Sequence, residues 1–361
     1  MTSVVLAGGG TAGHTSPLIA TAQALTELGV DELVAVGTAR GLEVRVIPEA
    51  GLDLELITPV PLPRKPNLDL LKLPYRLTKA VREAKAILRE RKADAVVGFG
   101  GYVSIPVYLA ARWMKVPVLV HEANHIPGIA NKIGARWASF VGTTFDTPMP
   151  GNPTLVGMPI NRRITHPQVS QSEARELFSL DPDRRTLLVS GGSQGAQAIN
   201  RAVLEARDAL LAEGIQILHV LGPKNFDDDP TITHASGAQY RPVAFVDDMA
   251  TAYAAADLMV GRAGAGTVMD TAISGLPVIF IPLPWGTGEQ GKNAAALVEA
   301  GGGVLLPESE LTADVLSGRV LELFRTDGTL EAMSERARAM YPADAADAMA
   351  RAVLEVIDRK G

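Results

Sequence analysis

Three glycine-rich runs carry the strongest chemical signal in the sequence. In chain order they are Gly8-Gly9-Gly10-Thr11-Ala12-Gly13-His14, Gly98-Phe99-Gly100-Gly101 and Gly191-Gly192-Ser193-Gln194-Gly195. Each follows a short apolar run. A glycine turn between a strand and a helix lets the backbone approach a phosphate, and the helix N-terminus offers N–H donors. We therefore expect a phosphate-bearing ligand at the carboxyl ends of parallel strands.

The first run also satisfies the G-x-G-x-x-G spacing of a dinucleotide-binding loop. That fingerprint requires an acidic residue at the end of the second strand, where it holds a ribose. The expected second strand ends Val34-Ala35-Val36-Gly37-Thr38 and supplies no acid. The sequence therefore argues against a nicotinamide coenzyme, and we expect no cofactor.

His14 and Glu122 are the two candidates for a general base. His14 directly follows the last glycine of the first run, where an imidazole could accept a proton or contact a phosphate. Glu122 and Asn124 follow the apolar run 117–120, and polar side chains at the carboxyl end of a parallel strand face the ligand crevice. A purely structural His14 remains an alternative, and the sequence does not fix which residue is the base.

The second half of the chain offers groups suited to a nucleoside diphosphate. The Ser193 hydroxyl and the helix N-terminus behind it can carry phosphates without a P-loop lysine or a required metal. The small-residue run Gly261–Thr267 opens another helix, and Asp270 lies where it could accept hydrogen bonds from a ribose. Glu289-Gln290 and Asn293 open a third helix at the same predicted sheet edge. Together these groups predict a nucleotide site.

The alternation of short apolar runs with longer amphipathic stretches predicts an α/β fold. We expect two doubly wound, Rossmann-like parallel-sheet domains that face a cleft. The strand candidates are Val4–Ala7, Leu33–Val36, Leu54–Ile57, Ala95–Val97, Val118–Val120, Ser139–Val141, Thr186–Ser190, Ile215–Val220, Leu258–Val260, Val278–Ile281 and Gly303–Leu306.

Five prolines within 147–167 interrupt the alternation and predict a domain boundary. We expect one domain over 1–160, a second over 161–343, and a C-terminal helix over 344–361. The apolar spacing of that helix allows it either to cap the second domain or to cross back to the first.

Composition and charge limit the classes of protein to which the chain can belong. The chain has 361 residues, 47% of them hydrophobic and 20% charged, and it contains no cysteine, which excludes disulfides and thiolate metal sites. No run approaches the roughly 18 apolar residues of a membrane-spanning helix, and the N-terminus is expected to be a first strand and not an export signal. Residues 1–163 carry 18 Lys and Arg against 13 Asp and Glu, whereas 164–361 carry 16 against 27. This asymmetry suggests different partners for the two halves.

At this point the chain resembles the peptidoglycan N-acetylglucosaminyltransferases of the membrane stage, a family with the GT-B fold. The resemblance covers essentially the whole length. It rests on GGGTAGH (8–14), GFGGYVS (98–104), HEANHIPG (121–128), GGSQGA (191–196), FVDDMA (245–250), RAGAGTVMD (262–270) and GEQGKNA (288–294). It implies an inverting hexosyltransferase that moves GlcNAc from UDP-GlcNAc to the MurNAc-pentapeptide on undecaprenyl diphosphate through a β-1,4 link, in cell-wall biogenesis.

The resemblance also implies roles for individual residues. It places Thr11, Ala12, Gly13 and Asn124 near the sugar and the acceptor, and Ser193 at the diphosphate. Val246 would pair with uracil through its backbone, and Gln290 would contact GlcNAc hydroxyls. Ala265, Gly266 and Thr267 would lie against the α-phosphate, with Asp270 on the ribose.

Three positions depart from the family pattern. The family commonly has a glutamate where Asp270 stands, so the reach toward a ribose differs by one methylene. The family's Gln-Gln pair is Glu289-Gln290 here, which leaves the first of the two sugar contacts in doubt. The linker arginine stands one place late, at Arg162.

A lipid-linked acceptor implies a membrane surface. Leu68–Leu77 mixes leucines with basic residues, and Trp113-Met114-Lys115 adds an interfacial aromatic beside a cation. We therefore expect an acceptor-binding, membrane-associating first domain at the anionic cytoplasmic face of the plasma membrane, a donor-binding second domain, and no nucleic acid partner. Core packing of the leucines is the alternative. For the whole chain, the rivals are a UDP-GlcNAc 2-epimerase and a non-catalytic nucleotide-sugar sensor.

Overall fold

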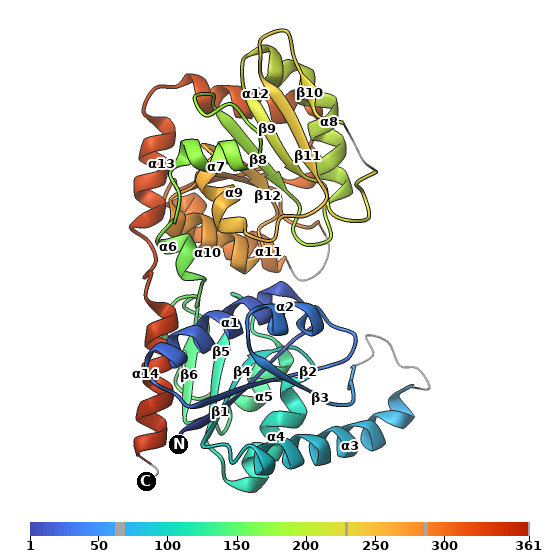
Figure 1. Cartoon of the computed structure of the whole chain (residues 1–361), viewed down its shortest axis with the longest axis vertical. Helices are drawn as coiled ribbons and strands as arrows, with labels where there is room; N and C mark the ends of the chain where they lie inside the picture. Colours follow the sequence, from blue (N-terminus) through green and yellow to red (C-terminus); the bar gives the residue numbers. More distant parts are fainter. Residues whose placement is uncertain (62–68, 228–229, 285–287, 360–361) are drawn as a thin grey trace. The chain divides into compact units, whose positions relative to one another are not determined.

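The chain folds into two compact units in a computed structural model (Figure 1). Unit 1 comprises Met1–Asn161 with Pro342–Gly361, and unit 2 comprises Arg162–Tyr341. The structure describes residues 1–61, 69–227, 230–284 and 288–359, and of 69–71 the backbone alone.

Unit 1 is built on a parallel sheet in the order β3-β2-β1-β4-β5-β6-β7. The chain starts in the middle, winds outward to β3 and then returns to the other side of β1. This reversal between β1 and β4 is the topological switch point at which such sheets bind ligands. The strands are β1 (Ser3–Gly8), β2 (Glu32–Gly37), β3 (Asp53–Leu56), β4 (Ala95–Gly100), β5 (Val118–Glu122), β6 (Phe140–Thr143) and β7 (Thr154–Leu155).

Helices cover both faces of this sheet because its strands alternate buried apolar residues on both sides. Val4 and Leu6 of β1 face the core that α1 and α14 complete, whereas Val5 and Ala7 face the core formed with α3 and α4. The helices of unit 1 are α1 (Ala12–Glu27), α2 (Glu43–Glu49), α3 (Asp69–Glu90), α4 (Ser104–Met114), α5 (Ile129–Gly134) and α14 (Ala345–Asp358).

The C-terminal helix crosses back to unit 1. Met349 and Val353 of α14 are fully buried in the same core as Leu18 and Leu25 of α1, and α14 runs beside α1 in Figure 1. The structure thereby decides between the two placements that the sequence left open.

Unit 2 repeats the topology with the order β10-β11-β9-β8-β12-β13-β14, in which β10 alone is antiparallel. Its switch point lies between β8 and β12. The strands are β8 (Thr186–Ser190), β9 (Gln216–Val220), β10 (Ile232–Thr233), β11 (Gln239–Val243), β12 (Leu258–Gly261), β13 (Val278–Phe280) and β14 (Gly303–Leu305).

The helices of unit 2 also cover both faces of their sheet (Figure 1). Leu187 and Val189 of β8 pack against α8 and α12 in the main core of the unit. The helices are α6 (Arg162–Thr165), α7 (Gln171–Leu177), α8 (Gln197–Ala212), α9 (Met249–Ala255), α10 (Ala265–Ser274), α11 (Glu289–Glu299), α12 (Ala313–Arg325), α13 (Thr329–Arg338) and the 3₁₀ turn η1 (Glu308–Glu310).

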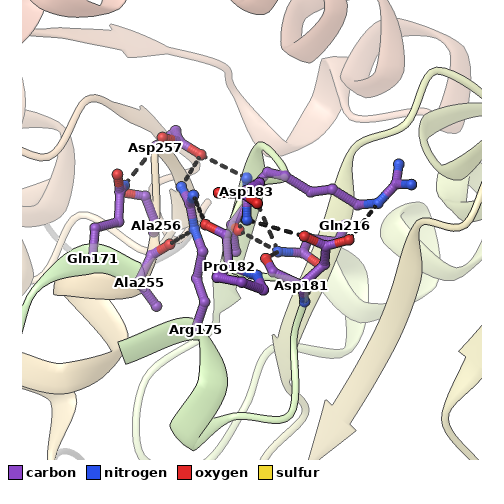
Figure 2. A network of polar contacts seen from close by, with 11 residues as sticks. Gln171, Arg175, Asp181, Pro182, Asp183, Gln216, Ala255, Ala256 and Asp257 are labelled. Carbon is purple, nitrogen blue, oxygen red and sulfur yellow. Dashed lines mark hydrogen bonds and ion pairs between the residues drawn. The ribbon is translucent and has the colours of Figure 1, made fainter. Parts of the chain in front are cut away.

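A polar network fixes the amino-terminal edge of this sheet (Figure 2). The buried Arg175 guanidinium donates to the Ala255 carbonyl at 3.0 Å, to the Pro182 carbonyl at 2.9 Å and to the Asp257 carboxylate at 2.8 Å. Asp257 also accepts from the Thr186 N–H at the start of β8. The network ties α7 to the loops before β8 and β12, at the end of the sheet opposite the glycine turns.

The predicted fold class is confirmed: both sheets are doubly wound. The strands that the sequence pattern did not predict are β7, β10 and β11. The first two have two residues each, and β11 contains Pro242, which is uncommon inside a strand because it has no N–H to donate.

Candidate functional site

The first two glycine runs meet at the switch point of unit 1, because they lie at the carboxyl ends of the adjacent strands β1 and β4. Their approach leaves no room for side chains. A Cβ on Gly100 would lie 3.0 Å from Cδ2 of His14, and one on Gly101, whose φ is +81°, would lie 2.7 Å from the Gly9 carbonyl oxygen. The glycines of the second run are thus required so that β4 can end against the first run and His14.

His14 is half-buried in the first turn of α1 and has a defined orientation. Its Nδ1 lies 3.0 Å from the Gly9 carbonyl oxygen and 3.3 Å from the Thr11 hydroxyl. A carbonyl oxygen only accepts, so the proton of the neutral ring is on Nδ1. Nε2 then carries the lone pair that can take a proton from a ligand.

Thr11, Ala12 and Gly13 form the start of the same helix. Thr11 and Gly13 are exposed and Ala12 is half-buried, so all three present their backbone at the carboxyl edge of the sheet. The structure therefore brings these three predicted contacts together with His14.

Glu122 organises the loop that follows β5. Its buried carboxylate accepts hydrogen bonds from the Asn124 N–H at 3.0 Å, the Gly128 N–H at 2.9 Å and the Asn131 amide at 3.0 Å. Three donors on one carboxylate leave little capacity for a further proton acceptor role. The arrangement favours loop positioning, with Asn124 half-buried beside it.

His121, the neighbour of Glu122, is fully buried. Burial lowers the pKa of its imidazole to about 4, partly offset by the bond from Nε2 to the Gly157 carbonyl. The ring is therefore neutral at pH 7, and it fixes the segment that leads out of unit 1.

The third glycine run closes around the loop after β9. Gly195 has φ +73°, and a Cβ there would collide with the Leu221 carbonyl oxygen, while one on Gly222 would lie 2.6 Å from the Gly195 nitrogen. The half-buried Ser193 lies in this turn. The close approach sets the backbone of the turn at the carboxyl end of β8.

A chain of buried, hydrogen-bonded side chains holds the loop after β9, against which that turn packs. Asn200 of α8 donates to the Leu221 carbonyl at 2.9 Å, and its amide oxygen lies 3.2 Å from Nε2 of His219. Nδ1 of His219 lies 3.1 Å from the Tyr240 hydroxyl. Burial lowers the pKa of His219 to about 3, so this chain is neutral and rigid at pH 7.

The turn between β12 and α10 lies on the other side of the unit 2 switch point. Ala265 is buried, Gly266 and Thr267 are half-buried, and a Cβ on Gly266 would meet open space. Backbone N–H groups at this helix start are thus accessible to an anion. Asp270, one turn further, is half-buried and hydrogen-bonded to Tyr253.

Two side chains that the sequence pattern did not single out hold the neighbouring loops in place. Arg262 is buried, donates to the Ile281 and Pro282 carbonyls, and pairs with Glu308 at 2.5 Å. Glu43 is fully buried beneath the first glycine turn of unit 1 and accepts from the Gly10 N–H at 2.8 Å. A charged residue on an otherwise apolar buried helix face was the available signal for Glu43.

The remaining predicted residues take different positions in unit 2. Gln290 accepts from the Leu283 N–H at 3.0 Å, so its amide nitrogen is the group left to donate, and the buried Asn293 donates to the Ala263 carbonyl. Val246 is buried in the loop before α9. Arg162 is exposed at the start of α6, at the boundary of the unit.

The described residues contain neither a metal-binding cluster nor a membrane-spanning helix. Within ranges 1–61, 69–227, 230–284 and 288–359, no three His, Asp or Glu side chains form a group able to hold a metal ion. No helix in those ranges has the length and apolar character needed to cross a bilayer.

Comparison with protein families gives two matches that together span most of the chain. Residues 4–143 match the glycosyltransferase family 28 N-terminal domain, and residues 186–349 match the glycosyltransferase family 28 C-terminal domain.

Individual proteins give the same picture. A curated relative from Cutibacterium acnes, a UDP-N-acetylglucosamine–N-acetylmuramyl-(pentapeptide) pyrophosphoryl-undecaprenol N-acetylglucosamine transferase, is 55% identical over 98% of this chain and 97% of its own length. The crystal structure of Acinetobacter baumannii MurG is similar with a TM-score of 0.75 and 28% identity, covering 98% of this chain and all of that one. A putative UDP-N-acetylglucosamine 2-epimerase from Listeria monocytogenes has a TM-score of 0.65 at 13% identity over 99% of this chain and 97% of its own, which is a likeness of fold alone.

The Asp270 carboxyl predicts a pH-dependent stability. Burial raises its pKa to about 7 against an ordinary value of 3.8, while the bond with Tyr253 lowers it. Between these pH values the folded state binds more protons than the unfolded state, so stability falls as the pH rises from about 4 to 7. Asp270→Asn removes this dependence: its Tm relative to the wild type should rise from pH 5 to pH 7 and be level above pH 8.

Tyr253→Phe is the matched variant. Loss of the hydroxyl that lowers the Asp270 pKa should raise the upper end of the pH range over which stability falls, as measured by thermal melts over the same pH series. A Tm difference between Asp270→Asn and the wild type that is constant from pH 5 to 8 would contradict this role of the carboxyl.

Proposed function

This chain belongs to glycosyltransferase family 28, among the peptidoglycan N-acetylglucosaminyltransferases of the MurG family, and from that membership we propose the substrates and residue roles below. The donor is UDP-N-acetylglucosamine. The acceptor is N-acetylmuramyl-pentapeptide carried on undecaprenyl diphosphate. The reaction transfers N-acetylglucosamine between them with inversion at the anomeric carbon.

One observation carries the assignment of the two substrates. Each unit has glycine turns at the switch point of its own sheet, but only the turn in unit 1 holds an imidazole whose Nε2 can take a proton. The turns of unit 2 offer instead backbone donors at two helix starts, which suit a diphosphate. We therefore assign the acceptor to unit 1 and the donor to unit 2.

The transfer is a single displacement. The acceptor 4-hydroxyl oxygen forms a bond to the anomeric carbon of the donor sugar, and its proton passes to Nε2 of His14. The bond from that carbon to the diphosphate oxygen breaks, and the electron pair leaves on UDP. The N-terminal ends of α8 and α10 stabilise the charge that develops on the diphosphate.

The donor contacts in unit 2 follow from the family pattern and from the exposed backbone. Ser193 and the backbone of Ala265, Gly266 and Thr267 bind the phosphates. Three further residues complete the nucleotide sugar: Asp270 on the ribose, Val246 on the uracil through its backbone, and Gln290 on GlcNAc hydroxyls through its amide.

The acceptor contacts in unit 1 come from Thr11, Ala12, Gly13 and Asn124, with Arg162 as a further substrate contact. Glu122, the second candidate base, supports Asn124 through a carboxylate that already accepts three hydrogen bonds, and in this assignment it does not take the proton. His14 is the base in this assignment.

Product analysis with labelled UDP-N-acetylglucosamine and the lipid-linked acceptor tests the function. Transfer gives a disaccharide-lipid, whereas a 2-epimerase gives UDP-N-acetylmannosamine and a non-catalytic sensor gives no product.

His14→Ala should lower kcat by about 10²- to 10⁴-fold, as expected for loss of a general base, with an unchanged KM for the donor. His234→Ala, in the turn that follows β10, should keep the wild-type rate. An unchanged kcat in His14→Ala would remove His14 from this role.

The acceptor lipid requires a membrane-facing surface, and we assign it to α3 and α4 at the cytoplasmic face of the plasma membrane. Tyr75 is 75% exposed and Trp113 is 72% exposed, and Nζ of Lys85 lies 3.9 Å from the centre of the Trp113 ring. Exposed aromatic rings beside cations suit an anionic lipid interface. Leu73 and Leu77 instead pack against the core, while Leu68 and the side chains of Leu70 and Leu71 lie outside the described residues.

Vesicle flotation tests this surface. The wild type should float with vesicles that contain anionic lipid and less with neutral vesicles, and Tyr75→Ala combined with Trp113→Ala should reduce the floated fraction several-fold. Leu177→Ala removes an equally exposed apolar side chain from α7 of unit 2 and is the control. Equal flotation of wild type and double variant would contradict the assignment.

A further inference from the structure

A single peptide group connects a buried carboxylate to His14. The Gly10 N–H donates to Oε2 of Glu43 at 2.8 Å, and the Gly9 carbonyl oxygen lies 3.0 Å from Nδ1 of His14. These two atoms belong to the same peptide, and in a trans peptide they point to opposite sides. The Gly9–Gly10 peptide is therefore held from both sides, by Glu43 at its N–H and by His14 at its C=O.

Glu43 is fixed on its other side as well. Its Oε1 accepts from the Thr38 N–H at 2.9 Å and from the Thr38 hydroxyl at 3.0 Å, and the residue is fully buried. A Cβ on Gly9, Gly37 or Gly41 would collide with the Glu43 side chain. The glycines around it thus form a cavity of the size and shape of this one side chain, which leaves the carboxylate no alternative position.

Hydrogen bonds in a chain polarise one another. A carboxylate that accepts from the peptide N–H increases the negative charge on the carbonyl oxygen of the same peptide. That oxygen then holds the Nδ1 proton of His14 more strongly and stabilises the imidazolium that forms when Nε2 takes a proton. The effect resembles that of a carboxylate bound directly to a catalytic histidine, with one peptide placed between them.

We propose that Glu43 is a positioning residue for transfer, which acts through the Gly9–Gly10 peptide to set the tautomer and the basicity of His14. The proposal rests on the proposed function only in taking His14 as the base. Gly101 completes the arrangement, because its lack of a side chain lets it cover the Gly9 carbonyl oxygen. No bond from Glu43 to a substrate is required.

Glu43→Gln tests the carboxylate with little change in volume. A glutamine side chain has only one oxygen, so it cannot accept from both Thr38 and the Gly10 N–H. Its NH₂ group must face one of these donors, which weakens the series of hydrogen bonds that leads to His14. We expect kcat to fall about 10-fold, which is the lower end of the range for loss of a group that orients a functional side chain without contacting the substrate. The KM for UDP-N-acetylglucosamine should not change, and the acid limb of the kcat/KM profile should move to lower pH because the imidazolium loses support.

Glu83→Gln is the matched control. Glu83 of α3 accepts from the Thr58 N–H at 2.6 Å through Oε2 and from the Thr58 hydroxyl at 2.9 Å through Oε1. Like Glu43 with Thr38, it binds the N–H and the hydroxyl of one threonine, but neither of these bonds leads to His14. This variant should keep the wild-type kcat and acid limb. Thermal melts and circular dichroism of both variants show how much of each effect is loss of folding.

A double-mutant cycle separates this proposal from the proposed function. If Glu43 acts through His14, Glu43→Gln should cause no further loss in a His14→Ala background. A full 10-fold loss in that background, or an acid limb that does not move in Glu43→Gln, would overturn the proposal while leaving His14 as the base. If His14→Ala alone keeps its kcat, the proposed base is wrong and the role of Glu43 falls with it.

Glu43→Asp keeps the negative charge but shortens the side chain by one methylene. If this variant has a reduced kcat while the acid limb of its kcat/KM profile stays at the wild-type pH, the result would support an effect through charge.

Discussion

The Gly9–Gly10 peptide is the constraint on which the site proposed in unit 1 depends. Its N–H is held by Glu43 and its C=O by His14, and the adjacent strand ends in glycines so that it can approach. Each partner needs the others. A side chain on Gly101 would lie 2.7 Å from the Gly9 carbonyl oxygen, Glu43 accepts from the Gly10 N–H, and the Gly9 carbonyl lies 3.0 Å from Nδ1 of His14. A turn that in other folds cradles a phosphate would, in the proposed function, orient a base.

Unit 2 uses the same device for a different purpose. Its glycine turn after β8 is also fixed by a buried polar chain, from Tyr240 through His219 and Asn200 to the Leu221 carbonyl. That chain is neutral, because burial lowers the pKa of His219 to about 3. A neutral support leaves the backbone donors of the turn available to an anion. The two glycine turns therefore have different supports: a neutral chain of side chains in unit 2 and the Glu43 side chain in unit 1.

Much of this arrangement could be predicted from the sequence, because a glycine run directly after an apolar strand is typical of a ligand-binding turn. The runs located both switch points, and the missing ribose acid argued against the dinucleotide interpretation. The relation between Glu43 and Gly10 could not be predicted. It joins residues 33 positions apart whose contact depends on how α2 packs against α1, β2 and β3. The strand β11 was missed because it is short and contains Pro242, which argues against a strand. The C-terminal helix could not be placed, since apolar spacing gives a buried face but not the partner that covers it.

The tautomer of His14 is the most direct test of a base oriented by the Gly9 carbonyl. Long-range ¹H–¹⁵N correlation spectra of the ¹⁵N-histidine-labelled protein report which ring nitrogen is protonated, and a His14→Gln sample identifies the His14 signals. At a pH where the ring is neutral, we expect a protonated Nδ1 and an unprotonated Nε2, with Nδ1 shifted when Glu43 is replaced by glutamine. A ring protonated on Nε2, or a Nδ1 signal indifferent to Glu43, would contradict this role of the Gly9–Gly10 peptide.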